Sequence, residues 1–199
     1  AHDGHLKKHP NYLFQELQRE ANAISCPSQA WIDTWASKTG YKDKLVKIPN
    51  AINVHEFQDI ELKAKNMEIT MLTTARLIPA KRVADGIKVV NQLSQKGVKL
   101  HYKIIGGGDD LDKLKSLVTQ YGIEEMVQFI GVLPFTKVLA ELSKADIYFH
   151  PSGNESFGIA MIEAMGAGLP VIAAKSGGAM DIVVPDTGVL CEIGDIDAL

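Results

Sequence analysis

From about residue 67 to its end, the chain alternates short β-branched apolar runs with segments whose apolar residues repeat at helical spacing. The runs expected to be strands are 67–74, 99–106, 126–131, 145–151, 169–174 and 187–193. The expected helices have apolar faces within 83–93, 111–118, 138–142 and 159–165. Repeated strand–helix–strand units build a parallel sheet with right-handed connections. The predicted fold class is therefore α/β, a doubly wound parallel sheet.

Residues 1–64 do not continue this alternation. We expect a helix over 12–20, a short strand within 21–28 and a helix over 31–40 that Gly40 stops. A further strand over 44–57 should run through Pro49 into a polar linker, with a boundary near 57–66. This is too little chain for a second doubly wound sheet. We therefore expect residues 1–64 to be the remnant of a preceding α/β domain, residues 65–199 to be a domain, and the whole chain to be a fragment of something longer.

The composition narrows the class of partner. Hydrophobic residues make up 46% and charged residues 23%, as in ordinary globular proteins. The net charge is −3 with mixed signs, so there is no basic field to hold a nucleic-acid backbone. Cys26 and Cys191 follow no metal or redox spacing, which favours unpaired thiols and a cytoplasmic location. No run approaches the roughly 18 to 20 apolar residues of a membrane-spanning helix.

The loops that follow the expected strands carry the candidate chemistry, because ligands of open α/β sheets bind beyond the carboxyl ends of the strands. These loops are 73–82, 106–110, 131–135, 151–158 and 175–181. Four of the five contain glycine, and the first contains Arg76, Lys81 and Arg82. Glycines allow close approach to the backbone, helix N-termini attract anions, and Arg or Lys supplies countercharge. The combination predicts a ligand that bears phosphate.

Each feature also has a plainer interpretation. Arg76 and Lys81 could be solvated loop charges, and Glu163 a surface glutamate on a helix that begins near residue 158. Glu155 could only cap that helix, where a negative charge is favourable by roughly 0.3 to 1 kcal/mol. His150 is expected to be a packed core histidine. No His, Cys and Asp cluster has metal-ligand spacing, and GGGDD at 106–110 fails as a dinucleotide fingerprint because Leu follows at 111.

Taken together, the motifs resemble one family. They are TTARLIPAKR, KIIGGGDDLDKLK, VQFIGVLP, ADIYFHPSGNESFGIAMIEAMGAGLPVIAAKSGGAMDIV and TGVLCEIGD. Residues 67–197 resemble the nucleotide-binding, Rossmann-like C-terminal domain of the retaining GT-B glycosyltransferases called glycosyl transferases group 1. ISCPS and KLVKIPNAINVHEF resemble the end of that family's N-terminal domain and its hinge. The stretch with two glutamates eight positions apart, followed by GAGLPVIA, is highly specific.

The resemblance implies a role for each motif. The residues matching Arg76 and Lys81 neutralise the donor diphosphate, and the one matching Glu155 contacts hydroxyls of the transferred sugar. Backbone N–H groups around Phe157 and Gly158 meet the sugar or phosphates, Glu163 binds the ribose, and the turn at Gly131 lies against the base. Arg82 stands where glycine is usual. The donor site expected in this way comprises Arg76, Lys81, Gly107, Gly131, Val132, Leu133, Glu155, Ser156, Phe157, Gly158, Ile159 and Glu163.

The family also offers a histidine near the sugar and the acceptor, in a context such as HD or HG. His2, followed by Asp3 and Gly4, fits that context, and His5 competes with it. The catalytic residues expected from the resemblance are therefore Arg76, Lys81, Glu155 and His2.

The two glutamates could instead be the acid and base of a glycosidase, which sit about 5 to 9.5 Å apart across one bond. Here Glu163 would lie on the helix and Glu155 before it, beside cationic loops, so the two would address opposite ends of one ligand. Departure of a nucleoside diphosphate mainly needs its charge stabilised, which Arg76, Lys81 and a helix N-terminus can do. The resemblance implies reaction with retention and no required metal.

The function expected is therefore hexosyl transfer from a UDP- or GDP-sugar to a glycan or lipid-linked acceptor, as in polysaccharide biosynthesis. The alternatives are a non-catalytic nucleotide-sugar binding module and a sugar-nucleotide epimerase. Any membrane contact would be peripheral, through the N-terminal domain that is mostly missing from the chain.

Overall fold

The computed structural model describes residues 19–40, 42–58, 60 and 68–199. Within these residues six strands form one parallel sheet, here called the main sheet, in the order β5-β4-β3-β6-β7-β8. Its strands are β3 (Ile69–Thr74), β4 (Leu100–Ile105), β5 (Val127–Gly131), β6 (Ile147–His150), β7 (Val171–Ala174) and β8 (Gly188–Cys191). The chain starts at the centre, moves to one edge and returns to build the other half, which is the doubly wound order. The predicted α/β fold is confirmed.

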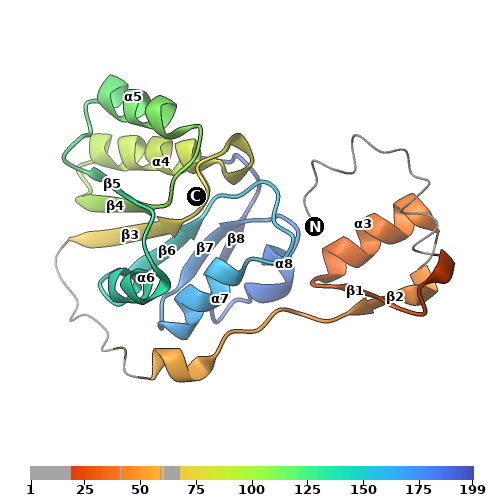
Figure 1. The fold of residues 1–199 in the computed structure, drawn as a ribbon. Coiled ribbons are helices and arrows are strands. Elements are labelled where there is room, and N and C mark those ends of the chain that lie inside the picture. Colours follow the sequence, from red (N-terminus) through yellow and green to blue (C-terminus); the bar gives the residue numbers. More distant parts are fainter. Residues whose placement is uncertain (1–18, 41, 59, 61–67) are drawn as a thin grey trace.

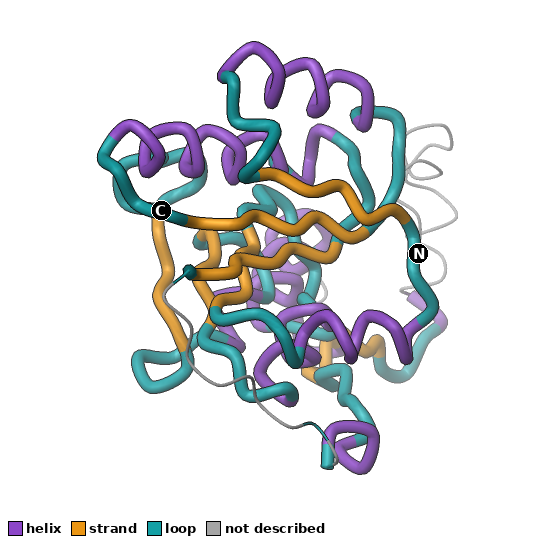
Figure 2. The backbone as a smooth tube through the Cα atoms, turned by 90° about the vertical axis from the view of Figure 1, so that its left-hand side faces the viewer, coloured by secondary structure: helices purple, strands orange, loops and turns teal. Residues whose placement is uncertain are grey.

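Helices cover both faces of the main sheet, as Figure 1 shows and as the perpendicular view in Figure 2 confirms. The helices on one face are α4 (Val83–Gln95) and α5 (Leu111–Tyr121), and those on the other are α6 (Phe135–Leu142), α7 (Ile159–Gly166) and α8 (Ala179–Ile182). All four helices expected from apolar periodicity are present. The strand boundaries lie within two residues of those expected, because the apolar runs include flanking residues that do not pair.

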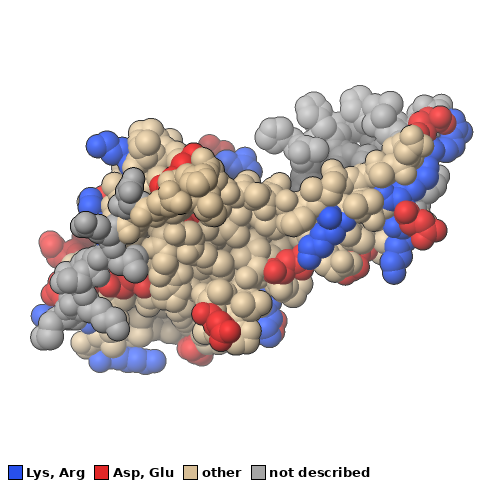
Figure 3. All heavy atoms as spheres, turned by 90° about the horizontal axis from the view of Figure 1, so that it is seen from below, with Lys and Arg blue, Asp and Glu red and all other residues tan. Residues whose placement is uncertain are grey.

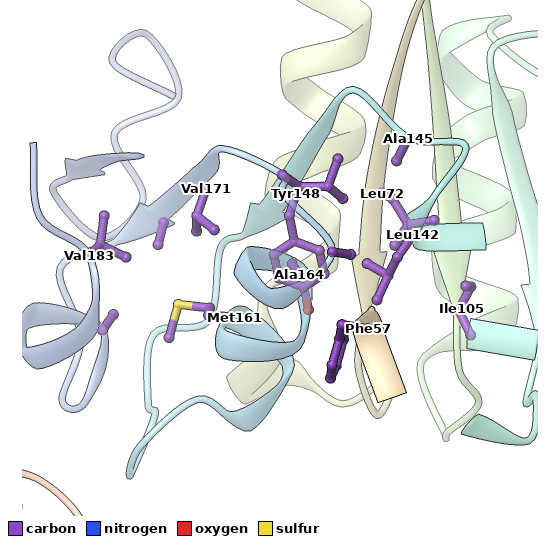
Figure 4. Close-up of a cluster of buried hydrophobic side chains, with 14 residues drawn as sticks. Phe57, Leu72, Ile105, Leu142, Ala145, Tyr148, Met161, Ala164, Val171 and Val183 are labelled. Atoms are coloured by element: carbon purple, nitrogen blue, oxygen red, sulfur yellow. The ribbon is translucent and has the colours of Figure 1, made fainter. Parts of the chain in front are cut away.

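Two apolar clusters pack the faces of the main sheet, because successive residues of a strand point to opposite sides. Met71 packs with Val83 and Ile87 under α4, whereas the next residue, Leu72, packs with Tyr148 and Met161 on the other side. Figure 4 shows this second cluster, in which Phe57 lies beside the residues of the sheet and of α7. Burying a side chain such as Leu72 contributes roughly 1.5 to 3 kcal/mol.

The residues before the main sheet form a smaller parallel pair, β1 (Ile24–Cys26) and β2 (Leu45–Lys47), joined through α3 (Gln29–Thr39). Ser28 caps α3 by accepting a hydrogen bond from the backbone N–H of Trp31, and Gly40 ends it at φ 75°. The short 3-10 helix η1 (Lys42–Lys44) precedes β2. Of the helix expected over 12–20, residues 12–18 lie outside the described residues, and Arg19 and Glu20 are helical.

The strand expected over 44–57 is wrong in its extent. Strand β2 ends at Lys47, because Pro49 lacks the N–H that a strand needs to continue pairing. The chain then forms the 3-10 helix η2 (Val54–Phe57), which begins where the side chain of Asn53 accepts a hydrogen bond from the N–H of His55. Phe57 of η2 is buried in the core of the main sheet. The division into residues 1–64 and 65–199 stays a prediction.

The surface carries charges of both signs. On the face drawn in Figure 3, Lys and Arg side chains are scattered among Asp and Glu. Both cysteines are buried and unpaired. No helix in the described part of the chain is long and apolar enough to cross a bilayer.

Candidate functional site

The loops at the carboxyl ends of the main-sheet strands are joined by backbone hydrogen bonds. The N–H of Leu77 donates to the carbonyl of Gly107 at 2.9 Å, and the N–H of Gly153 donates to Ala80 at 3.1 Å. The N–H of Gly178 donates to the carbonyl of Glu155 at 2.9 Å. Four loops far apart in sequence therefore meet at one edge of the sheet. This edge includes the point between β3 and β6 where the winding reverses, which is where such sheets bind ligands.

Two glycines make this meeting sterically feasible. Gly106 has φ 139°, and an added Cβ there would overlap the backbone of Ala75. Gly177 has φ 40°, and an added Cβ would overlap the carbonyl of Glu155. Any larger residue at either position would push the loops apart.

Glu155 lies in the loop after β6 and is held by two side chains. Its Oε2 accepts a hydrogen bond from Lys81 Nζ at 2.6 Å and lies 3.1 Å from Nε2 of His150. Burial alone would raise the pKa of Glu155, but the hydrogen bonds from His150 and Lys81 and their charges lower it to about 2. Glu155 is therefore ionised at neutral pH. Its side chain does not cap α7, so the plainer interpretation of Glu155 as a helix cap is wrong.

His150 is buried, with 3% of its surface exposed, as expected for a packed core histidine. Its ring also stacks on Tyr148 at a centroid distance of 6.2 Å, which orients Nε2 toward Glu155. The sequence reasoning missed this contact. The available signal was the position of His150 at the last residue of an apolar strand, five residues before a glutamate in the following turn.

The three cationic residues of the loop after β3 have different surroundings. Lys81 ends the 3-10 helix η3 (Pro79–Lys81) and reaches Glu155, whereas Arg76 is exposed and makes no side-chain hydrogen bond or ion pair with the described residues. Arg82 instead turns back to Asp85, with Nε and Nη2 both 2.7 Å from Oδ2. Its φ of 51° is left-handed, the conformation that glycine adopts most easily. Arg82 thus occupies a backbone position suited to the glycine usual in the family.

Glu163 lies on α7 and is half-buried. Its carboxylate makes no hydrogen bond or ion pair with any described residue. Burial raises the pKa of Glu163, and the nearby carboxylate of Glu56 raises it further. Glu163 thus offers partly desolvated acceptor oxygens that have no hydrogen-bond partner among the described residues, unlike an ordinary surface glutamate.

The remaining expected residues border the same edge. Gly131 ends β5 at φ 86°, Val132 after it is 79% exposed, and Leu133 packs against the core. An added Cβ on Gly107 would lie 3.1 Å from the side chain of Val132, so these two loops are in contact. Phe157 is buried, Gly158 is the N-cap of α7 at φ 108°, and Ile159 begins the helix with 45% of its surface exposed.

The segment around α3 is attached to this edge by three polar contacts. Ser28 Oγ donates to the carbonyl of Ser156 at 2.7 Å. Asp181 on α8 accepts from the backbone N–H of Gln29 at 2.7 Å and pairs with Lys47 at 2.7 Å. Between α3 and the loop that holds Glu155 lies a cleft of about 290 Å³, here called the α3 cleft. The sequence did not indicate this cleft, because the residues that line it lie more than a hundred positions apart.

Two further expectations concern the catalytic residue His2 and the metal ion. His2 lies outside the described residues. Among the described residues, no group of three or more His, Cys, Asp or Glu side chains is placed to hold a metal ion.

The fold and the edge together define a class: a doubly wound α/β domain with a cation and an ionised carboxylate at its switch point. Comparison with known proteins specifies this class further. The family model described as "Glycosyl transferases group 1" matches residues 54–199, and the chain belongs to this family.

Individual relatives agree with this assignment. The chain is 28% identical over 193 residues to the putative colanic acid biosynthesis glycosyltransferase WcaL of Escherichia coli (strain K12), a match covering 94% of this chain and 48% of the relative. It is 28% identical over 202 residues to a GDP-mannose-dependent monoacylated alpha-(1-6)-phosphatidylinositol monomannoside mannosyltransferase of Corynebacterium glutamicum, covering 93% and 52%. The chain thus spans about half the length of the curated relatives it matches.

Solved structures share the fold. The structure of Anabaena Alr3699/HepE in complex with UDP and glucose superposes with a TM-score of 0.80 at 22% identity, covering 98% of this chain and 57% of the other. The Rossmann-like domain expected from the resemblance to GT-B glycosyltransferases is confirmed.

Proposed function

We propose that this chain is the donor-binding part of a retaining glycosyltransferase that moves a hexose from a nucleoside-diphosphate sugar to a glycan or lipid-linked acceptor. The observation that carries the proposal is the Lys81–Glu155 pair at the switch point, with Arg76 exposed in the same loop as Lys81. A cation and an ionised carboxylate side by side match the two halves of such a donor, an anionic diphosphate and a neutral sugar rich in hydroxyl donors.

The proposed roles follow the donor from end to end. Val132, the exposed residue of the turn after β5, lies against the base, and the half-buried carboxylate of Glu163 accepts hydrogen bonds from the ribose hydroxyls. Arg76, Lys81 and the backbone N–H groups of Phe157 and Gly158 receive the diphosphate. Glu155, ionised at neutral pH, accepts hydrogen bonds from the transferred sugar. The backbone of Gly107, Ser156 and Ile159 borders this path.

In the proposed reaction the bond between the anomeric carbon and the diphosphate oxygen breaks, and the electron pair goes to the diphosphate. Arg76 and Lys81 stabilise that negative charge, which requires no metal ion. The acceptor hydroxyl forms the new bond on the face that the diphosphate leaves and passes its proton to the departing phosphate oxygen. The configuration at the anomeric carbon is thereby retained.

The relatives indicate the range of substrates to test. One is named for GDP-mannose and a phosphatidylinositol mannoside, one for colanic acid biosynthesis, and one solved neighbour holds UDP and glucose. UDP- and GDP-sugars are therefore the first donors to try. Polysaccharide precursors and lipid-linked glycans are the first acceptors. A cytoplasmic location and a peripheral membrane contact during action on lipids stay predictions.

The binding test is calorimetry of the chain with UDP-, GDP- and ADP-sugars. We expect one nucleotide class to bind, and Lys81→Ala and Glu163→Gln each to weaken that binding roughly tenfold, since each removes one charge-assisted contact. Lys113 is an exposed lysine on α5, so Lys113→Ala is the matched control and should leave the affinity unchanged. Failure of every nucleotide to bind, or binding by both site variants as tight as that of the unmodified chain, would refute the assignment.

Catalysis is tested in the full-length protein that contains this segment. A transferase releases nucleoside diphosphate in proportion to acceptor added, whereas a binding module releases none and an epimerase converts the donor without an acceptor. The anomeric configuration of the product then tests retention, because an inverted linkage contradicts the proposed mechanism.

A further inference from the structure

The α3 cleft lies next to the proposed donor site but is separate from most of it. One wall is a face of α3 that includes Trp31, Thr34 and Lys38, and the other is the loop with Asn154 and Glu155. None of Arg76, Lys81, Val132 or Glu163 lines it. The α3 cleft therefore adjoins the proposed donor path at Glu155, the residue assigned to the transferred sugar.

The aromatic wall of the α3 cleft is held in place by stacking. The rings of Trp31 and Trp35 stack with centroids 5.6 Å apart and planes 19° apart, and Lys38 Nζ lies 5.6 Å from the centre of the Trp35 ring. These contacts restrict the orientation of the Trp31 indole before any ligand arrives, which reduces the entropy lost on binding. Trp31 thus lines the cleft with a pre-ordered indole.

The opposite wall supplies hydrogen-bonding groups. The side chain of Asn154 makes no hydrogen bond with the described residues, so both its amide N–H donors and its oxygen are available. Lys38 adds N–H donors from the α3 side. An apolar ring face opposite a few polar groups is the pattern of small-molecule sites, and about 290 Å³ is at the small end of their range. Such a volume suits one sugar ring better than a nucleotide.

We propose that the α3 cleft is a subsite for a pyranose ring of the acceptor, with its C–H face on the Trp31 indole and its hydroxyls bonded to Asn154 and Lys38. This inference rests on the proposed function. A pyranose has one face of C–H groups and a rim of hydroxyls, which matches the two walls. A ring in this cleft borders Glu155, the residue assigned to the transferred sugar, so under the proposed function it lies next to the sugar that it would accept.

Intrinsic fluorescence gives a direct test, because the chain has only two tryptophans and both are on α3. The chain is first saturated with the nucleotide that binds in calorimetry, then titrated with methyl glycosides of glucose, galactose, mannose and N-acetylglucosamine. We expect at least one glycoside to change the emission saturably. The same glycoside should bind Trp31→Ala roughly tenfold more weakly, measured by saturation-transfer NMR.

Two controls separate the subsite from general damage. Trp35→Phe keeps an aromatic ring behind Trp31 and should bind the glycoside within about threefold of the unmodified chain. Both tryptophan variants should bind nucleotide with unchanged affinity, because neither residue lies on the donor path. Unchanged nucleotide affinity also shows that each variant is folded.

The outcomes distinguish this proposal from the one on which it rests. If nucleotide binds but no glycoside changes the fluorescence, or if Trp31→Ala binds the glycoside as well as the unmodified chain, the subsite is refuted and the donor site stands. If no nucleotide binds the unmodified chain, the proposed function fails and this inference fails with it.

Discussion

The acidity of Glu155 depends on its neighbours His150 and Lys81. Its pKa is lowered to about 2 in the folded chain, below the ordinary value of 4.5. A carboxyl whose folded pKa is depressed contributes stability that is fully present above its unfolded pKa and is lost as the pH falls through the folded value. The pH window of this contribution therefore runs from about 4.5 down to about 2.

This gives a prediction for acid unfolding. Glu155→Gln should lower the free energy of unfolding at pH 7 by about 2 kcal/mol, and the difference from the unmodified chain should shrink between pH 5 and pH 2. Denaturant unfolding at a series of pH values measures it. Glu192 is an exposed carboxylate, so the effect of Glu192→Gln on stability should depend much less on pH. A difference for Glu155→Gln that stays constant across this range would contradict the proposed cause.

A second prediction for a single residue concerns the backbone of Arg82. Its left-handed backbone costs roughly 1 kcal/mol that glycine would not bear, while its guanidinium pairs with the buried Asp85. Arg82→Ala loses the pair and keeps the backbone cost, whereas Arg82→Gly loses the pair and removes that cost. We expect the glycine variant to be about 1 kcal/mol more stable than the alanine variant. Thermal or denaturant unfolding of the two measures the difference, and equal stability would show that the backbone is not strained.

At the scale of elements, the loop at 175–178 supports the backbone of the loop at 151–158. Gly177→Ala should destabilise the chain by about 2 kcal/mol or more and weaken nucleotide binding, because its Cβ would displace the carbonyl of Glu155. Gly97→Ala is the matched control, since Gly97 also has positive φ but faces open space. It should cost only about 1 kcal/mol and leave binding unchanged. Equal effects on binding would show that the loop contact is unimportant.

How far the sequence predicts these elements depends on where the determining contacts lie. The strands and helices of the main sheet follow from local apolar periodicity, because the spacing of apolar residues along each segment reflects which of its faces are buried. The strand predicted over 44–57 was too long because Pro49 cannot continue the pairing, and beyond it Ile52 and Phe57 pack against the core of the main sheet without pairing. The left-handed Arg82 carries no local signal, and the contact of His150 with Glu155 needs the turn geometry.

The loops of the candidate site were also predicted from the sequence only in part. Their glycines and charges, and their placement at strand ends, were enough to predict that they meet. The sequence did not predict that Lys81 and Arg82, adjacent in the chain, would point to different carboxylates. That difference follows from the backbone conformation of one residue, which propensities do not reveal.

At the scale of the whole molecule, Asp181 connects the α3 segment to the main sheet. Asp181→Ala removes its ion pair with Lys47 and its hydrogen bond from Gln29, while the core of the main sheet is untouched. We expect the backbone amides of α3 to exchange hydrogen about tenfold faster and those of β3 and β4 to be unchanged. Hydrogen exchange measured by NMR or mass spectrometry checks this, with Asp186→Ala as an exposed control. Faster exchange throughout the sheet would show that Asp181 supports the global fold instead.

The pairing of Lys81 with Glu155 affects which molecules the proposed donor site can select. Without a ligand, Oε2 of Glu155 already accepts a hydrogen bond from Lys81 Nζ. A free monosaccharide that displaces Lys81 offers no charge in return, whereas a diphosphate draws Lys81 toward itself and frees Glu155 for the attached sugar. Under the proposed function, the site thereby discriminates against unactivated sugars even where they far outnumber the donor.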